Sequence, residues 1–173
     1  GDGDADLLYA GGGVGWHENT DGSGSFGPPQ VIMTGGDFRS IFASDLDGDG
    51  DTDVLSASWS NTYSPEKIAW YENLGGAIFG PQQIIMTGAG GECVSAADLD
   101  GDGDTDVLSA ASYGTWASGE TAWYENLGGG NFGPQQILSP GGAESVHASD
   151  LDGDGDVDVL SASYAFYGDD WIA

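Results

Sequence analysis

Hydrophobic residues in this chain gather in short segments that are separated by glycine, aspartate and proline. Segments such as DVLSAS and TAWYEN are rich in Val, Ile, Trp, Tyr and Ser, a composition that favours β-strands. No window has a sustained helical period, so we expect essentially no helix. In the centre of the chain the pattern predicts four strands, at Glu92–Asp98, Asp106–Ala111, Thr121–Asn126 and Phe132–Leu138.

The same arrangement of segments repeats along the chain. DLDGDGDTDVLSAS begins at Asp45 and returns with small changes at Asp98 and Asp150, at spacings of 53 and 52 residues. A WYEN-type segment and an FGP-type segment follow in the same order each time. Four antiparallel strands in a repeat of about 50 residues are typical of a β-propeller blade. We therefore predict an all-β fold of propeller-type blades, in about 3.3 repeats that form part of a larger propeller or assembly.

The phase of the repeat sets the predicted blade boundaries. We expect a partial blade with strands two to four over residues 1–36, complete blades over 37–89 and 90–141, and a partial blade with strands one, two and the start of three over 142–173. The chain begins inside one Asp-rich motif and stops just before a WYEN-type segment. This phase favours a window from a longer polypeptide, or else chains that complete each other's blades through open edges as a homo-oligomer or filament.

Charge narrows the classes of partner. The chain carries 29 acidic residues against two basic ones, for a net charge of −27, which argues against nucleic acid and anionic membrane. No segment approaches the roughly 20 apolar residues of a membrane span, so we expect no membrane insertion. All aspartates but Asp21, Asp37, Asp169 and Asp170 lie in four short clusters. Such clustering favours metal binding over the evenly acidic surface of a halophilic protein.

The clusters have the spacing of a cation-binding loop. Aspartates at positions one, three, five and nine supply carboxylates, glycines at four and six permit sharp turns, and position seven offers its backbone carbonyl. All-oxygen ligation favours Ca²⁺ over zinc or copper, and Mg²⁺ requires a stricter octahedral geometry. The predicted ligands are Asp45, Asp47, Asp49, Asp51 and Asp53; Asp98, Asp100, Asp102, Asp104 and Asp106; Asp150, Asp152, Asp154, Asp156 and Asp158; and, in a partial site without its first two ligands, Asp2, Asp4 and Asp6.

The D-x-D-G-D-G-x-x-D loop, the FGP strand and the period of about 50 residues resemble FG-GAP and VCBS repeats, which also build the head of integrin α chains. The resemblance covers essentially the whole chain. It implies Ca²⁺ in the hairpin loop between the first two strands of each blade, and extracellular adhesion or ligand binding. Propellers of this family usually close with seven blades, whereas this chain holds about 3.3 repeats.

The connection between strands two and three is the part of the repeat that varies. Variable loops on a fixed scaffold are where binding specificity usually lies. These connections are rich in aromatic residues that suit sugar rings and protein contacts, although packing on neighbouring blades explains them equally well. The candidate ligand-binding residues are Trp59, Tyr63, Tyr113, Trp116, Tyr164 and Tyr167.

These observations favour a non-catalytic protein. Glu18, Glu72 and Glu125 repeat once per blade, and a repeated carboxylate is more often architectural than catalytic. We expect a calcium-stabilised scaffold, extracellular or at the cell surface, for adhesion or for binding a glycan or protein ligand. The alternatives are a structural subunit of a self-assembling extracellular fibre and, less favoured, the propeller module of a secreted carbohydrate-active enzyme.

Overall fold

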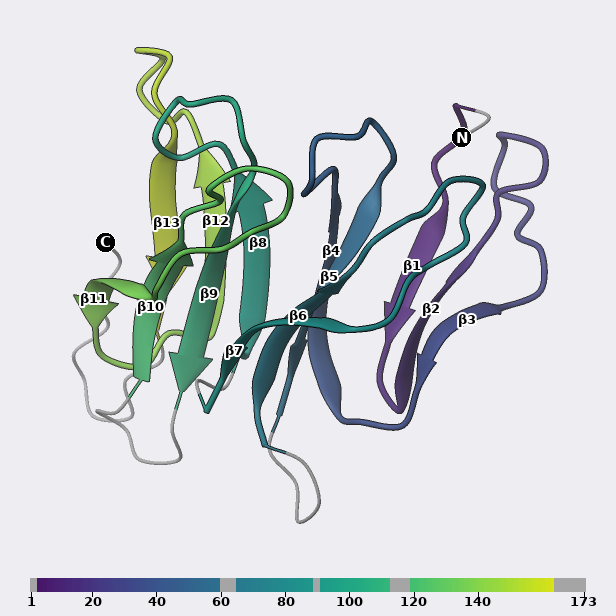
Figure 1. The fold of residues 1–173 in the computed structure, drawn as a ribbon, viewed down its shortest axis with the longest axis horizontal. Helices are drawn as coiled ribbons and strands as arrows, with labels where there is room; N and C mark the ends of the chain where they lie inside the picture. The colour runs from purple at the N-terminus through teal and green to yellow at the C-terminus, as the bar shows by residue number, and fades with distance from the viewer. Residues whose placement is uncertain (1–2, 60–64, 89–90, 113–118, 164–173) are drawn as a thin grey trace.

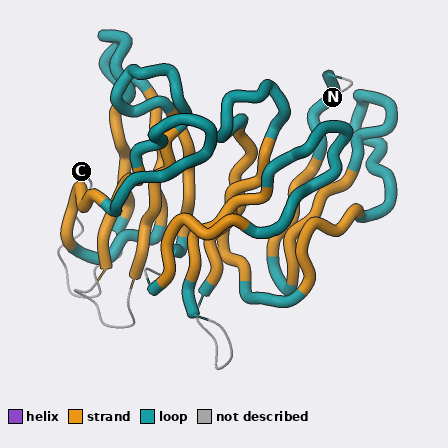
Figure 2. The backbone as a smooth tube through the Cα atoms, in the orientation of Figure 1, coloured by secondary structure: helices purple, strands orange, loops and turns teal. Residues whose placement is uncertain are grey.

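The computed structural model describes residues 3–59, 65–88, 91–112 and 119–163. Within these residues the chain forms thirteen short strands and no helix, as predicted (Figures 1 and 2). Accordingly, the described part of the chain contains no helix long and apolar enough to cross a membrane.

The strands form four antiparallel sheets, which we call blades 1 to 4. Blade 1 contains β1 (Leu7–Ala10), β2 (Gly13–His17) and β3 (Gln30–Thr34). Blade 2 contains β4 (Phe38–Ser44), β5 (Asp53–Ser58), β6 (Lys67–Tyr71) and β7 (Gln83–Thr87). Blade 3 contains β8 (Cys93–Ala97), β9 (Asp106–Ser112), β10 (Gly119–Tyr124) and β11 (Gln136–Pro140). Blade 4 contains β12 (Ser145–Ser149) and β13 (Asp158–Ala162).

Within each sheet, every strand pairs with the next strand of the chain, so each sheet is a simple meander. The four sheets stand side by side in chain order (Figure 1). The first strands of blades 2, 3 and 4 are neighbours, since β8 contacts both β4 and β12. The backbone N–H of Val94 in β8 donates to Ser40 Oγ in β4 at 3.1 Å. This arrangement of four-stranded meanders is that of propeller-type blades.

The prediction of a strand over Phe132–Leu138 is wrong about where the strand begins. The structure begins β11 at Gln136, and Phe132 makes only an isolated bridge with Asn126. The residues between them include Gly133 and Pro134, and proline has no N–H to donate to a ladder. Phe26 and Phe79 make the same isolated bridge in blades 1 and 2. The FGP segment is therefore a bridge followed by a break rather than the start of a continuous strand.

Hydrophobic cores lie between consecutive blades. One core combines Leu55 and Ile68 of blade 2 with Val94 and Val107 of blade 3. Similar clusters join blade 1 to blade 2 around Val14, and blade 3 to blade 4 around Val146. The second strands of blades 2 and 3 lie between two neighbouring blades, so β5 is buried throughout and β9 is buried except at its last residue. Each blade thus depends on its neighbours for a complete core.

Candidate metal centre

Three Asp-rich loops connect the first and second strands of blades 2, 3 and 4, at the upper edge of the sheets in Figure 1. The register is the same in all three, because the last residue of the first strand pairs with the ninth residue of the loop: Ser44 with Asp53, Ala97 with Asp106 and Ser149 with Asp158. The loops are therefore hairpin connections built in one geometry.

The backbone of each loop turns sharply at two glycines with positive φ angles. Gly48 and Gly50 have φ angles of +79° and +94°, a region that residues with a Cβ rarely adopt. In this conformation both backbone N–H groups turn toward the first aspartate. Gly48 donates to Asp45 Oδ1 at 2.8 Å, and Gly50 donates to Asp45 Oδ2 at 3.0 Å. The same pair of hydrogen bonds holds Asp98 and Asp150.

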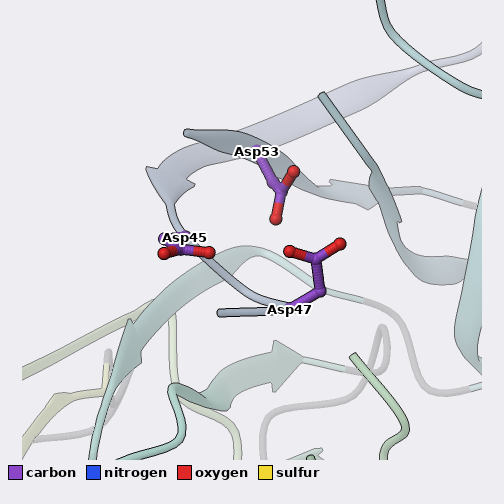
Figure 3. Close-up of side chains that lie close together, drawn as sticks. All are labelled: Asp45, Asp47 and Asp53. Carbon is purple, nitrogen blue, oxygen red and sulfur yellow. The ribbon is translucent and has the colours of Figure 1, made fainter. Parts of the chain in front are cut away.

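Carboxylates at positions one, three and nine converge in each loop. In blade 2 these are Asp45, Asp47 and Asp53, with one oxygen of each within 4.8 Å of the others (Figure 3). Blades 3 and 4 repeat the arrangement, which gives the Asp45 cluster (Asp45, Asp47, Asp53), the Asp98 cluster (Asp98, Asp100, Asp106) and the Asp150 cluster (Asp150, Asp152, Asp158). The structure thus contains three Asp clusters that can hold a metal ion.

The fifth and seventh positions, also predicted as ligands, have other contacts. Asp49, Asp102 and Asp154 are not members of the clusters. Each instead accepts the backbone N–H of the residue two further on, at Asp51, Asp104 and Asp156, over 2.8–2.9 Å. In this structure the fifth carboxylate stabilises the turn of the loop, and a role for it and for the seventh carbonyl as ligands stays a prediction.

The ninth aspartate is the structural centre of each loop. Asp53 is fully buried, and its Oδ2 accepts the N–H of Leu46 at 2.9 Å while its Oδ1 accepts the N–H of Asn73 at 2.8 Å. Asp106 is equally buried and accepts the N–H groups of Leu99 and Asn126. This side chain therefore ties the start of the loop to the end of the third strand.

The clusters are electrostatically unfavourable without a counter-charge. Burial raises the pKa of Asp53, and the nearby carboxylates of Asp47 and Asp49 raise it further against the two N–H donors. The pKa of Asp106 is raised by burial and by its own neighbouring carboxylates. Burial likewise raises the pKa of Asp47. A cation would act in the opposite direction, because it favours the ionised form of all three carboxylates.

The donor set fits a hard divalent cation. Each cluster offers carboxylate oxygens and contains no sulfur or imidazole ligand, as oxygen-preferring cations require. The three clusters differ in exposure, since Asp53 and Asp106 are buried whereas all three members of the Asp150 cluster are exposed. The Asp45 and Asp98 clusters are therefore the better shielded from solvent.

The partial site at the start of the chain shares a hydrogen bond with the complete loops, from an asparagine N–H to the ninth aspartate. Asp6 Oδ1 accepts the N–H of Asn19 at 2.8 Å, as Asp53 does from Asn73. Asp4 lies against the turn at Gly22, where an added Cβ would be 2.6 Å from its carboxylate. Asp2 lies outside the described residues. Among the described residues of this loop no three carboxylates gather.

Of the aromatic candidates for ligand binding, the structure describes Trp59. The guanidinium of Arg39 stacks over its ring at 4.7 Å from the centroid. Trp59 also lines a small cavity of about 50 Å³ between blades 1 and 2, with Met33, Asp37 and Lys67 among its walls. Tyr63, Tyr113, Trp116, Tyr164 and Tyr167 lie outside the described residues.

The asparagine of the WYEN-type segment is a site residue that sequence reasoning missed. Asn73 and Asn126 donate their backbone N–H to the ninth aspartate, and their side chains donate to the residue before that aspartate. The signal was present, because Asn19, Asn73 and Asn126 occupy one position of the repeat. Its meaning could not be found without the pairing of the strands.

Comparison with known protein families identifies the repeat. The profile of the FG-GAP-like repeat matches residues 1–56, 45–109 and 98–161. Each match includes an Asp-rich loop and the strand that follows it. A comparison with curated proteins finds no match.

Proposed function

Because this chain belongs to the FG-GAP-like repeat family, a family of repeat scaffolds, we propose that it is a calcium-stabilised binding scaffold. The observation that carries the proposal is the convergence of carboxylates one, three and nine in the same register in three successive blades. Bound Ca²⁺ would supply positive charge at the centre of each cluster. The proposal takes its support from the geometry and from the family.

The first and third aspartates are the ligands that the loop presents. The two glycine N–H groups hold Asp45 by both of its oxygens, so that the carboxylate faces the cluster in a fixed orientation. Asp47 accepts the N–H of Asp49 at 3.1 Å. Preorganised carboxylates lose little rotamer freedom on binding, which favours affinity.

The ninth aspartate connects the site to the blade. Since Asp53 is hydrogen-bonded to Leu46 and Asn73, a cation held by its carboxylate also strengthens the link between the loop and the third strand. Metal binding of this kind adds directly to the free energy of unfolding. The role proposed for the ion is therefore structural.

Calcium binding is tested by the number of ions bound. Isothermal titration of the chelator-treated protein should give three Ca²⁺ per chain, one for each cluster. Asp47→Asn, Asp100→Asn or Asp152→Asn should each remove one ion. The control Asp37→Asn makes the same change of charge outside the clusters and should leave three. An absence of binding, or a stoichiometry that these substitutions do not change, would overturn the proposal.

The proposed setting is extracellular or at the cell surface. Extracellular Ca²⁺ modules bind at about 10⁻⁴ to 10⁻³ M, which suits the calcium level found outside cells. Exposed clusters such as the Asp150 cluster are typical of weaker sites, since water competes for the ion. Rigid extracellular scaffolds commonly serve adhesion and ligand binding, and these are the roles we propose.

The proposed ligand is a polysaccharide or protein bound by the aromatic connections between strands two and three. Trp59 offers an indole with a cation stacked on it, beside a cavity that includes Lys67. A glycan array with Trp59→Ala and Trp116→Ala tests this role, because loss of signal is expected for both. Retained signal in both variants would contradict it. Negative-stain microscopy distinguishes the scaffold from a fibre, since only a fibre forms filaments.

A further inference from the structure

Asn126 of blade 3 contacts the Asp-rich loop between β4 and β5 of blade 2. It follows β10, and its backbone N–H donates to Asp106 Oδ1 at 2.7 Å. Its side-chain Nδ2 donates to the carbonyl of Thr105 at 2.9 Å and to the carbonyl of Leu46 at 2.7 Å. The first two bonds stay within blade 3, whereas the third crosses to the loop of the preceding blade. Asn126 is only 1% exposed, and its bonds to Asp106 and Leu46 are buried.

Leu46 is the loop residue that receives this bond. It lies between Asp45 and Asp47, two members of the Asp45 cluster, and is 1% exposed. Its N–H donates to Asp53 Oδ2, the third member, while its carbonyl accepts from Asn126. A buried backbone carbonyl that loses its partner is unfavourable, so the loop is held in place from the neighbouring blade. The position of Leu46 in turn sets the positions of the two aspartates beside it.

Asn73 is a matched comparison from the same position of the repeat. Its backbone N–H donates to Asp53, and its side chain donates to Thr52 and accepts from Gly75, as Asn126 does with Thr105 and Gly128. Within the described residues, the side chain of Asn73 donates inside its own blade, to the carbonyl of Thr52. The two asparagines thus differ in the inter-blade bond.

The second loop residue is buried to a different extent in each of the three loops. Leu46 is covered by blade 3, Leu99 is half-buried, and Leu151 is 60% exposed. The described part of the chain provides no asparagine that donates to the carbonyl of Leu99 or Leu151. Within the described residues, Leu46 is thus the second loop residue that is packed against blade 3 and also accepts a hydrogen bond from an asparagine.

We propose that Asn126 is a positioning residue for the Asp45 cluster of the preceding blade, and that it couples metal binding between blades 2 and 3. The coupling runs through hydrogen bonds from Asp106 to Asn126, from Asn126 to Leu46, and from Leu46 to Asp53. The coupling has a direction, because Asn126 contacts Asp106 in the cluster of its own blade and Leu46 in the loop of the preceding blade. This inference rests on the proposed function, in that the clusters bind Ca²⁺.

The experiment measures Ca²⁺ affinity at one cluster at a time by isothermal titration. Asp100→Asn with Asp152→Asn leaves the Asp45 cluster, and Asp47→Asn with Asp152→Asn leaves the Asp98 cluster. Asn126→Ala should weaken the Asp45 cluster roughly five- to tenfold, the effect of losing one buried hydrogen bond, although the substitution lies in another blade. Asn73→Ala should leave the Asp98 cluster within about twofold, because no bond from Asn73 reaches blade 3.

Two results would overturn the inference. One is an Asp45 cluster whose affinity stays within about twofold in Asn126→Ala. The other is an Asp98 cluster weakened equally by Asn73→Ala, which would indicate general loosening rather than a specific bond.

A second measurement avoids any dependence on the folding of the variants. In the wild-type protein without metal, the side-chain amide protons of Asn126 should exchange with solvent roughly tenfold more slowly than those of Asn73, because Asn126 is itself buried and donates to the buried carbonyl of Leu46, a bond that Asn73 lacks within the described residues. Equal rates would contradict the inter-blade bond. If the wild-type chain binds no Ca²⁺, the proposed function fails, and this exchange experiment still decides whether Asn126 holds Leu46.

Discussion

At the residue scale, the aspartates of one cluster differ in what they stabilise. Asp53 is buried and accepts two backbone N–H groups, whereas Asp47 is only half-buried and accepts one. Removing the charge of Asp53 also removes an acceptor from the fold. Removing the charge of Asp47 chiefly removes a proposed ligand and a repulsion between carboxylates. The two positions should therefore respond differently to the same substitution.

Asp53→Asn should destabilise the protein both with and without calcium. An asparagine amide offers one oxygen, so one of the two N–H donors is left without its acceptor, at a cost of about 1–3 kcal/mol. Asp47→Asn should destabilise only the calcium-loaded protein, since it relieves repulsion in the metal-free one. Urea denaturation in calcium and in chelator measures both. Equal destabilisation by the two substitutions in chelator would contradict this division of roles.

The pH dependence of the metal-free protein should have an unusual sign. The pKa values of Asp47, Asp53 and Asp106 are raised above the ordinary 3.8 in the folded state. At a pH near and above 3.8 the folded state therefore binds more protons than the unfolded state. The free energy of unfolding should thus rise as the pH falls from neutral toward 3.8. With calcium the sign should reverse, because protons compete with the ion. Urea denaturation at about pH 7, 6 and 5 tests this, and a metal-free protein that weakens over this range would contradict it.

At the scale of elements, adjacent blades pack in direct contact with each other. The turn that follows β10 places Gly130 against the indole of Trp70 in blade 2, where an added Cβ would lie 2.5 Å from the ring. Gly129 has nearly the same backbone conformation, with φ at +63° against +69°, but an added Cβ would meet nothing closer than 3.8 Å. The two glycines therefore separate backbone strain from contact between blades.

Gly130→Ala should lower the free energy of unfolding by more than Gly129→Ala does. Both variants place an alanine at positive φ, which costs about 1 kcal/mol, and only Gly130→Ala also forces Trp70 to move. Thermal unfolding of the two variants at saturating calcium gives the comparison. If the two losses are equal, the packing of Trp70 against this turn does not stabilise the interface.

Many of the strands and connecting loops could be predicted from sequence. The first two strands and the loop between them follow from the repeated DLDGDGDTDVLSAS pattern, since apolar residues and Asp-Gly turns alternate there. The start of the fourth strand was misplaced, because the FGP segment has a β-type composition but Pro134 has no N–H for the ladder. The inter-blade role of Asn126 could not be predicted, since its partner Leu46 lies 80 residues away.

Which aspartates of a loop converge could not be predicted from sequence, for a related reason. Spacing along the chain identified every aspartate of the loop as a candidate but could not separate those that converge from those that brace the turn. Asp45, Asp47 and Asp53 gather, whereas Asp49 accepts the N–H of Asp51. That distinction depends on the positive φ angles of Gly48 and Gly50, which turn the backbone between them.

At the scale of the whole molecule, two facts oppose each other. Each hydrophobic core is shared by consecutive blades, so the packing is cooperative along the chain. The net charge of −27 opposes compaction, and much of it is concentrated in the loops at one edge of the sheets. Cations in the three clusters would neutralise this edge where repulsion is strongest, which makes calcium the expected determinant of stability.

The most direct test is calorimetric unfolding of the wild-type protein, once in about 10 mM Ca²⁺ and once in chelator. This calcium concentration is roughly ten or more times the expected dissociation constant. Three occupied sites should raise the melting temperature by about 10 °C or more, given about 1.4 kcal/mol or more for each site. The same concentration of Mg²⁺ should give a smaller rise, which separates specific ligation from screening of charge. Superimposable unfolding curves in calcium and in chelator would contradict a structural role for the three clusters.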